Sequence, residues 1–390
     1  MGRLPLARWK LDLNIEPSIQ ETILDNLSHL VIPPSQLIFE KDAGIGTGGY
    51  GEVYLAVLTG PSNTPPKKVA VKKLRIVQAK ETRRRTAIFK FQRLVRELTV
   101  WSTAEHPNIL ELVGFYLSED YECAQLVPAY MVHGNVRDYI KTWQPSVVTR
   151  LNFVEAITLG INYLHNCHPS ICHGDLKPSN VLVNDDIEAV LCDFGLATFI
   201  EESGLPSGLT TSNTIKGSTR YMSPELLQDN DAKNTLESDM WAWGCTTFEN
   251  SAKRPSLFQG LTDLEPYHTA MRDVNVMMAM VLGKCPGSVE LLSDLTPDTD
   301  TTCHRILDSL KQIIAECWVF NSAERPSSTE IIDRLSPSDA EISGGPSPVD
   351  WSSPIGSMGE DDWLSTEPEH EGYQDGGHSS PTIEASFSSS

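Results

Sequence analysis

Long apolar runs and paired cysteines are missing from this 390-residue sequence. No run of about 18 apolar residues is present, so a membrane-spanning helix is not expected. The N-terminus has no apolar stretch followed by a cleavage site, and we expect neither a signal peptide nor a membrane anchor. None of the eight cysteines forms a CxxC pair, which favours buried free thiols in a reducing compartment, the cytoplasm or the nucleus.

Basic residues are missing from the end of the chain. After Arg334 there are eleven acidic residues and no Lys or Arg, and the formal net charge of the chain is −21. A chain this acidic is not expected to bind nucleic acid. Residues 336–390 are rich in Ser, Pro, Gly and acids, so they cannot bury enough apolar surface to offset the entropy cost of ordering. We interpret them as a disordered tail.

The spacing of apolar residues divides the rest of the chain. Within residues 1–39, a helical repeat that ends at Pro33-Pro34 is formed by Ile19, Ile23, Leu27 and Leu30. It predicts a short helix packed on the main domain, with a partner-binding helix as the alternative. From residue 40 to about residue 130, strand-like runs occur at 53–58, 69–74, 109–116 and 124–127, with a helix predicted over 86–103. Beyond residue 135 helical periodicity dominates, for example at 147–165 and 305–320.

A glycine-rich segment precedes the strand-like run at 53–58. Residues 45–53 read Ile-Gly-Thr-Gly-Gly-Tyr-Gly-Glu-Val, which gives Gly46, Gly48 and Gly51 the spacing GxGxxG. Glycines let backbone N–H groups approach phosphate oxygens closely. A strand follows the segment where a dinucleotide-binding fold needs a helix, so that fold is disfavoured. A nucleotide-binding loop and a flexible turn between strands remain as interpretations.

Lys72 ends the apolar segment Val69-Ala70-Val71 that follows the glycine-rich segment. A lysine there can reach phosphates beneath the loop, although strands often end in a lysine with no such role. Glu97 lies at the edge of the apolar stripe of the predicted helix, between Leu94 and Trp101. It is therefore the candidate ion-pair partner of Lys72, and a solvated helix glutamate is the alternative.

Two further motifs connect these features with phosphoryl transfer. Residues 173–180 read His-Gly-Asp-Leu-Lys-Pro-Ser-Asn and residues 193–195 read Asp-Phe-Gly. With these motifs, in order, the chain resembles the eukaryotic protein kinase family over about residues 40–335. Glu-His-Pro-Asn-Ile-Leu at 105–110, and Cys-Trp at 317–318 ahead of Glu-Arg-Pro, resemble its tyrosine-kinase-like, mostly serine/threonine-specific branch. The resemblance implies a bilobal α+β fold, with a small β-rich N-lobe and a larger, mainly helical C-lobe.

The resemblance also implies a reaction, transfer of the ATP γ-phosphate to Ser or Thr hydroxyls of protein substrates, with ATP and Mg²⁺ as cofactors. Asp175 would accept or orient the hydroxyl proton, and Lys177 would steady the γ-phosphate. Asn180 and Asp193 would supply oxygen ligands to Mg²⁺. The nucleotide would be held by Ile45, Gly46, Gly48, Gly51, Val53, Lys72 and Glu97.

Supporting positions follow the family pattern, with two departures. Glu225 in Ser-Pro-Glu is expected to pair with Arg325, and Asp239 is expected to hold the catalytic-loop backbone. Ser218 stands where the family usually has threonine. Gly174 replaces the arginine that binds a phosphorylated activation loop in the family. We therefore expect activity that does not depend on phosphorylation at Thr210, Thr211, Ser212 or Thr214.

Other functions remain open from the sequence. A pseudokinase scaffold shares the fold, but it would have lost one of the nucleotide, metal or catalytic residues, and none is lost here. A tyrosine or dual-specificity kinase and a small-molecule kinase of similar fold are further alternatives. The expected partners are protein substrates, with signalling partners bound through the N-terminal helix or the acidic tail.

Overall fold

A computed structural model describes residues 23–48, 51–60, 65–75, 84–118, 123–200, 218–228, 232–251, 265–270, 272–289 and 301–335. The acidic tail at 336–390 and Ile19 lie outside the described residues, as do Thr210, Thr211, Ser212 and Thr214. Within the described ranges, no helix has both the length and the apolar character needed to cross a bilayer. Of the seven cysteines whose side chains the structure describes, four are buried, two are half-buried and Cys285 is exposed, and all seven are free.

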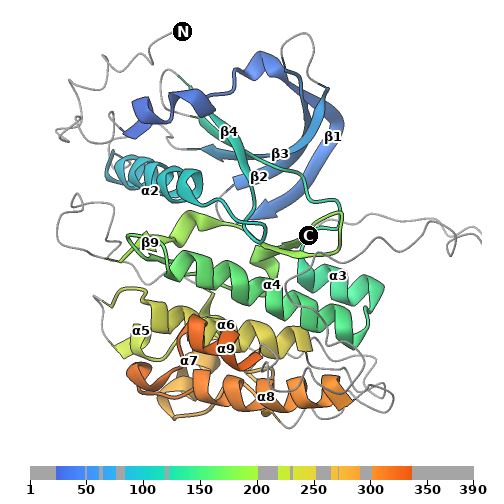
Figure 1. The fold of residues 1–390 in the computed structure, drawn as a ribbon. Coiled ribbons are helices and arrows are strands. Elements are labelled where there is room, and N and C mark those ends of the chain that lie inside the picture. The colour runs from blue at the N-terminus through green and yellow to red at the C-terminus, as the bar shows by residue number, and fades with distance from the viewer. Residues whose placement is uncertain are drawn as a thin grey trace, which may run out of the picture. The chain divides into compact units, whose positions relative to one another are not determined.

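The N-lobe is built on a five-stranded antiparallel sheet with the order β1-β2-β3-β5-β4 (Figure 1). Its strands are β1 (Leu37–Gly48), β2 (Gly51–Leu58), β3 (Lys67–Arg75), β4 (Leu112–Leu117) and β5 (Cys123–Pro128). Consecutive strands mostly pair through short connections, while helix α2 (Arg84–Thr103) lies between β3 and β4 in sequence.

The sheet differs most from the sequence-based prediction at β1 and β4, while β2, β3 and β5 differ from the predicted runs by one or two residues at their ends. Strand β1 was not predicted, because its register with β2 shifts between Phe39 and Gly44 and no regular alternation of apolar residues results. Strand β4 begins three residues later than the apolar run that starts at Ile109. Ile109 and Leu110 are buried, but Ile109 lies opposite Leu191 in an isolated bridge and the N–H of Leu110 donates to the carbonyl oxygen of Leu191, which is outside the five-stranded sheet. An apolar run therefore marks burial here and not strand pairing.

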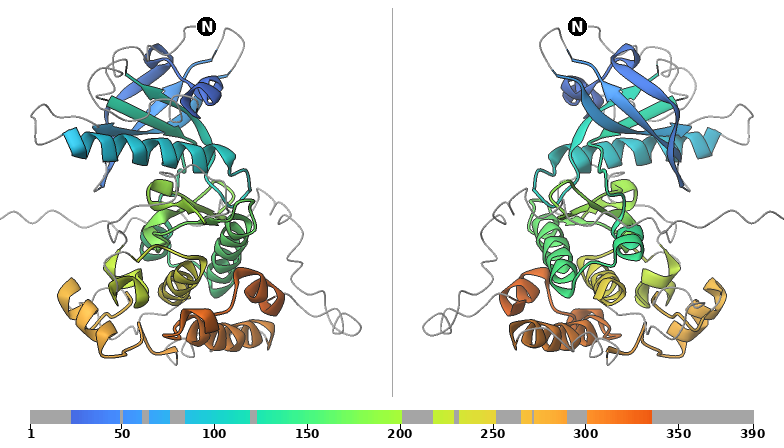
Figure 2. Two further views of the ribbon diagram at one scale, coloured as in Figure 1. Left: turned by 90° about the vertical axis from the view of Figure 1, so that its left-hand side faces the viewer. Right: turned by 90° about the vertical axis from the view of Figure 1, so that its right-hand side faces the viewer.

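Helix α2 covers one face of the sheet. Leu94 and Leu98 of α2 belong to the same buried cluster as Phe115 of β4 and Leu126 of β5. Both views in Figure 2 show α2 between the sheet and the helical lobe. Residues 23–26 are also helical, and Leu24 lies in this cluster with no exposed surface.

The C-lobe consists mainly of helices. They are α3 (Val136–Trp143), α4 (Val147–His165), α5 (Glu225–Gln228), α6 (Leu236–Ser251), α7 (Asp273–Val281), α8 (Thr301–Cys317) and α9 (Ser328–Leu335). Helix α4 has the predicted bounds, whereas α8 begins and ends earlier than the predicted 305–320. Two short antiparallel pairs lie between α4 and α5. They are β6 (Ile171–Cys172) with β9 (Thr198–Phe199), and β7 (Val181–Val183) with β8 (Ala189–Leu191).

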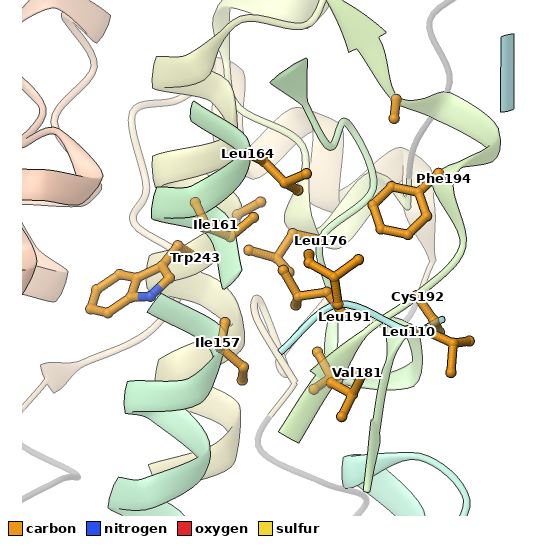
Figure 3. Close-up of a cluster of buried hydrophobic side chains, with 14 of the residues drawn as sticks. Leu110, Ile157, Ile161, Leu164, Leu176, Val181, Leu191, Cys192, Phe194 and Trp243 are labelled. Atoms are coloured by element: carbon orange, nitrogen blue, oxygen red, sulfur yellow. The ribbon is translucent and has the colours of Figure 1, made fainter. Parts of the chain in front are cut away.

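The loops that carry the chemical motifs are anchored in the core of the C-lobe. Figure 3 shows Leu176 and Phe194 in one cluster with Ile161 and Leu164 of α4. All four side chains are fully buried. Because protein interiors are close-packed, this anchoring restricts the backbone of the residues that lie next to Leu176 and Phe194 in the sequence.

Candidate active site

The sheet register brings the glycine-rich segment over Lys72. Gly46 lies opposite Val53, Val53 lies opposite Lys72, and Lys72 lies opposite Leu126, so the four form one row across the sheet. Directly opposed residues on antiparallel strands share a face. Gly51 has a steric reason to be glycine, since a Cβ atom there would lie 2.3 Å from the carbonyl oxygen of Lys73. Gly48 pairs with Gly51, and Ile45 is half-exposed beside Gly46.

Lys72 holds two carboxylates from separate elements. Its Nζ lies 2.8 Å from Oε1 of Glu97 on α2 and 2.7 Å from Oδ1 of Asp193. Burial by itself would lower the pKa of Lys72, but the two carboxylates outweigh it and raise that pKa above its ordinary value. For Asp193, burial acts to raise the pKa and the charge of Lys72 prevails, which lowers it. Lys72 and Asp193 are therefore both ionised at neutral pH.

Aromatic contacts hold α2 against the two motif loops. The ring centroid of Phe194 lies 5.6 Å from that of Trp101 on α2 and 5.5 Å from that of His173. The indole Nε1 of Trp101 donates to the carbonyl oxygen of Leu110. A displacement of α2 would break these contacts together with the Lys72–Glu97 pair, so the position of α2 and the geometry of the site are coupled.

Asp175 lies at the centre of a hydrogen-bonded group on the catalytic loop. The amide of Asn180 donates to the carbonyl oxygen of Asp175 at 2.8 Å and to its Oδ2 at 3.0 Å. Nζ of Lys177 lies 2.7 Å from the same Oδ2 and also donates to Oγ of Ser218 at 2.7 Å. The backbone N–H of Ser218 donates to Oδ1 of Asp175 at 3.0 Å. Both carboxylate oxygens of Asp175 are thus oriented from two separate segments.

The backbone before Asp175 is held by Asp239 of α6. The N–H groups of His173 and Gly174 donate to the carboxylate of Asp239 at 2.6 and 2.9 Å, and Nε2 of His165 lies 3.2 Å from it. Burial would raise the pKa of Asp239, but its hydrogen bond and charge interaction with His165 lower that pKa. Buried charge at this position is tolerated because each oxygen accepts a hydrogen bond.

Gly174 has a backbone conformation that other residues avoid. Its φ angle is +76°, in the left-handed region. A Cβ atom at this position would lie 2.4 Å from Nδ2 of Asn234 and 2.8 Å from the carbonyl oxygen of Leu196. Nδ2 of Asn234 donates to the carbonyl oxygen of Gly174 at 3.3 Å. Asn234 therefore occupies the space that a larger side chain at position 174 would need.

The oxygen atoms left for a metal ion come from Asn180 and Asp193. Asn180 uses its amide nitrogen to bond Asp175, and Asp193 uses Oδ1 to bond Lys72. Within the described residues, no hydrogen bond engages the side-chain oxygen Oδ1 of Asn180 or Oδ2 of Asp193, whereas the backbone carbonyl oxygen of Asn180 accepts from the N–H of Cys192. Mg²⁺ prefers one or two such hard oxygens together with phosphate oxygens. The donor set therefore fits a magnesium–nucleotide complex beside Lys72.

Comparison with known proteins decides the family. The family model described as protein kinase domain matches residues 39–335, about three quarters of the sequence. The chain belongs to the protein kinase family. The bilobal arrangement of a β-sheet lobe and a helical lobe agrees with that assignment.

Several curated kinases are similar to this one. Receptor-interacting serine/threonine-protein kinase 3 of Rattus norvegicus is 32% identical over 73% of this chain and 52% of its own length. A receptor-like protein kinase of Ipomoea nil is 30% identical over 65% of this chain and 22% of its own length. Mitogen-activated protein kinase kinase kinase 3 of Arabidopsis thaliana is 28% identical over 57% of this chain and 34% of its own length. The kinase described here thus spans about half, or less, of the relatives it matches.

The ion pair expected between Glu225 and Arg325 is present in the kinase. The guanidinium of Arg325 donates to both carboxylate oxygens of Glu225, at 2.7 and 2.8 Å, and to the carbonyl oxygen of Glu237. The Arg325 side chain has no exposed surface. Burial would raise the pKa of Glu225, but its hydrogen bonds with Arg325 lower it. The pair ties the start of α5 to the segment between α8 and α9.

Sequence reasoning missed one group of residues near the catalytic loop. Arg137 of α3 and Glu249 of α6 pair with one another and contact Tyr221, which lies three residues after Ser218. No spacing rule connects α3 with α6, since more than a hundred residues separate the two charges. Asn234 was missed for the same reason, because its role depends on its contact with Gly174.

Proposed function

We propose that this kinase transfers the γ-phosphate of ATP to Ser and Thr hydroxyls of protein substrates in intracellular signalling. The observation that carries the proposal is the orientation of the Asp175 carboxylate by Asn180, Lys177 and Ser218, next to the Lys72–Asp193 pair. The serine/threonine-specific kinases named among its relatives support the hydroxyl preference. Lys177 supports the same hydroxyl preference, because a lysine at this place in the catalytic loop is typical of serine/threonine kinases.

Asp175 is the residue that would act on the hydroxyl group of the protein substrate. Its carboxylate accepts or orients the proton of the substrate hydroxyl, which leaves the oxygen able to attack phosphorus. Lys177 holds Oδ2 of Asp175 in place and presents a positive charge to the transferring phosphoryl group. Ser218 links both residues to the segment that precedes α5, so that the catalytic loop and this segment move together.

Other residues would serve the nucleotide and the metal. Lys72 would hold phosphate oxygens, while Glu97 keeps the lysine in position. Asn180 and Asp193 would hold Mg²⁺ with the oxygens that the protein leaves free. When bound, ATP would supply the phosphoryl group and Mg²⁺ would offset its negative charge. Ile45, Gly46, Gly48, Gly51 and Val53 would cover the nucleotide from the sheet, as the register above Lys72 suggests.

The direct test is transfer of the γ-phosphate to a generic protein substrate by the full chain. We expect transfer by the wild type, loss on chelation of divalent metal, and a loss of at least 100-fold in the Asp175→Asn variant. Phospho-amino-acid analysis should then find phosphoserine or phosphothreonine. Equal background signal from both proteins would favour a pseudokinase scaffold, and phosphotyrosine would favour a tyrosine or dual-specificity enzyme.

Gly174 supports a second element of the proposal, activity without loop phosphorylation. Position 174 has no side chain to bind a phosphate, and Asn234 fills the adjacent space. Changing Thr210, Thr211, Ser212 and Thr214 together to Ala should leave kcat within a few-fold of the wild type. A hundredfold loss of kcat in a variant that still folds would contradict this element alone.

A further inference from the structure

Five side chains form a charged cluster beside the catalytic loop. We call Arg137, Arg220, Tyr221, Glu249 and Glu265 the Arg–Glu cluster. Nη1 of Arg137 lies 3.0 Å from Oε1 of Glu265, and its Nε lies 2.9 Å from Oε1 of Glu249. Nη2 of Arg137 donates to the hydroxyl of Tyr221, which donates to Oε2 of Glu249. Nε of Arg220 lies 3.3 Å from Oε2 of Glu265.

The charges of the cluster cancel. Two guanidinium groups face two carboxylates, and the phenol of Tyr221 is neutral, because burial and then the charge of Glu249 raise its pKa well above its usual range. For Arg137, burial would lower the pKa, but Tyr221, Glu249 and Glu265 together raise it. The formal charges of the cluster therefore sum to zero.

The cluster lies close to the place of the acceptor hydroxyl. Ser218 bonds Asp175, and the 3₁₀ helix Thr219–Tyr221 starts at the next residue. Tyr221 of the cluster and Asp175 also line the same pocket, together with Ser218. The cluster therefore adjoins the place where an acceptor segment would lie, within reach of substrate side chains a few residues from the acceptor.

Arg137 is the member of the cluster that shields both carboxylates. It contacts Glu249 and Glu265 at the same time, and its side chain is 23% exposed. Arg220 is committed to the fold, because it also donates to the carbonyl oxygens of Pro266, Tyr267 and Ala270. A basic substrate side chain would have to compete with the internal guanidinium of Arg137, which loses no translational freedom on pairing.

We propose that Arg137 is a specificity-determining residue, which neutralises Glu249 and Glu265 and so removes any preference for Lys or Arg near the acceptor hydroxyl. This inference rests on the proposed function, since it concerns the peptide substrate of that reaction. The kinase accordingly takes acceptor segments with uncharged side chains at least as well as basic ones.

The test uses three peptides that differ only at the positions two to four residues from the acceptor. These positions are uncharged in the first peptide, Arg in the second and Glu in the third. With the wild-type chain, kcat/KM for the neutral and Arg peptides should agree within about threefold. Arg137→Gln leaves a net negative cluster, and should favour the Arg peptide by about 5- to 10-fold, an effect that about 0.5 M salt should remove. Glu265→Gln leaves a net positive cluster and should favour the Glu peptide by a similar factor.

Lys67 and Glu111 provide matched controls. They form an exposed ion pair, 2.7 Å apart, between β3 and the start of β4. Lys67→Gln and Glu111→Gln change the protein charge by the same amounts as the two cluster variants, and should leave the peptide preference unchanged. Thermal unfolding of every variant checks that it folds, and Glu265→Gln keeps the test open if Arg137→Gln does not fold.

Three results would overturn the inference: a strong wild-type preference for the Arg peptide, unchanged preferences in the folded cluster variants, or an equal loss for all peptides in Arg137→Gln. The last result would mean that Arg137 only holds the 3₁₀ helix Thr219–Tyr221. Binding of the same fluorescent peptides is measured in parallel. If no protein transfers phosphate, the proposed function fails, while the binding preferences still decide the role of Arg137.

Discussion

Replacing Gly174 with alanine tests the geometry of the catalytic loop directly. A residue with a Cβ atom costs roughly 1–2 kcal/mol in the left-handed region, and the restricted unfolded chain returns about 0.4–1 kcal/mol of this. Gly134 is a matched control, since its φ angle is +67° and a Cβ atom there would meet nothing within 4 Å. The backbone cost therefore applies equally to Gly174→Ala and Gly134→Ala.

Only Gly174→Ala adds a steric cost. Its Cβ atom would have to displace Nδ2 of Asn234 from 2.4 Å and the carbonyl oxygen of Leu196 from 2.8 Å. Loss of the Asn234 hydrogen bond costs roughly 0.5–1.5 kcal/mol, and forcing the Leu196 backbone aside costs about 1–3 kcal/mol. The expected excess over Gly134→Ala is therefore about 2–4 kcal/mol, or about 4–8 °C in Tm for a domain of this size.

The assay is thermal unfolding of the wild type, both alanine variants and the Gly174→Ala/Asn234→Ala double variant. The double variant should recover part of the excess, because it removes the softer of the two obstacles. We also expect Gly174→Ala to lower kcat by about 10- to 100-fold, since Asp175 is the next residue. If the two single variants unfold within about 1 °C of each other, the steric reasoning is wrong.

Three further predictions concern buried charge. Asp239→Asn replaces one of two accepting oxygens with a donor that faces a backbone N–H, so we expect a loss of about 2–4 kcal/mol in urea unfolding and a large loss of kcat. Glu225→Gln should cost about 1–2 kcal/mol at pH 7. Because pairing with Arg325 lowers the pKa of Glu225, that stabilisation is complete above about pH 5 and disappears as the pH falls through the lowered value, so the two proteins should converge in acid. Glu155 is the opposite case, since burial raises its pKa to about 7. The stability that its protonated carboxyl group contributes to the fold is complete below about pH 4.5 and is lost as the pH rises through 7. Glu155→Gln should therefore match the wild type at pH 5 and exceed it by about 1–2 kcal/mol at pH 8, after allowance for solvent screening; a constant difference between those pH values would contradict the assignment.

The elements that the sequence predicted well are those with regular apolar spacing. Helix α4 has the predicted bounds because its apolar face repeats over nineteen residues. Strand β1 escaped prediction because shifts in its register interrupt the alternation. Ile109 and Leu110 were assigned to a strand because burial beneath α2 and strand pairing leave the same apolar signal.

The residues of the candidate site were recognisable from sequence because phosphoryl transfer limits which side chains serve at each position. Charged and amide side chains at set spacing identify Lys72, Asp175, Asn180 and Asp193 without any coordinates. Glu97 followed from its place on the helical stripe. Their roles in catalysis stay predictions until the assays above are done.

Local sequence alone determined the order of motifs, the two-lobe division and the identity of these candidate residues, since each depends on neighbours within a few turns of chain. Only the tertiary structure decided which distant charges meet. Arg137 reaches Glu249 across 112 residues, and Asn234 reaches Gly174 across 60. Such contacts are set by the packing of α3, α6 and the catalytic loop on one core, and no sequence period records them.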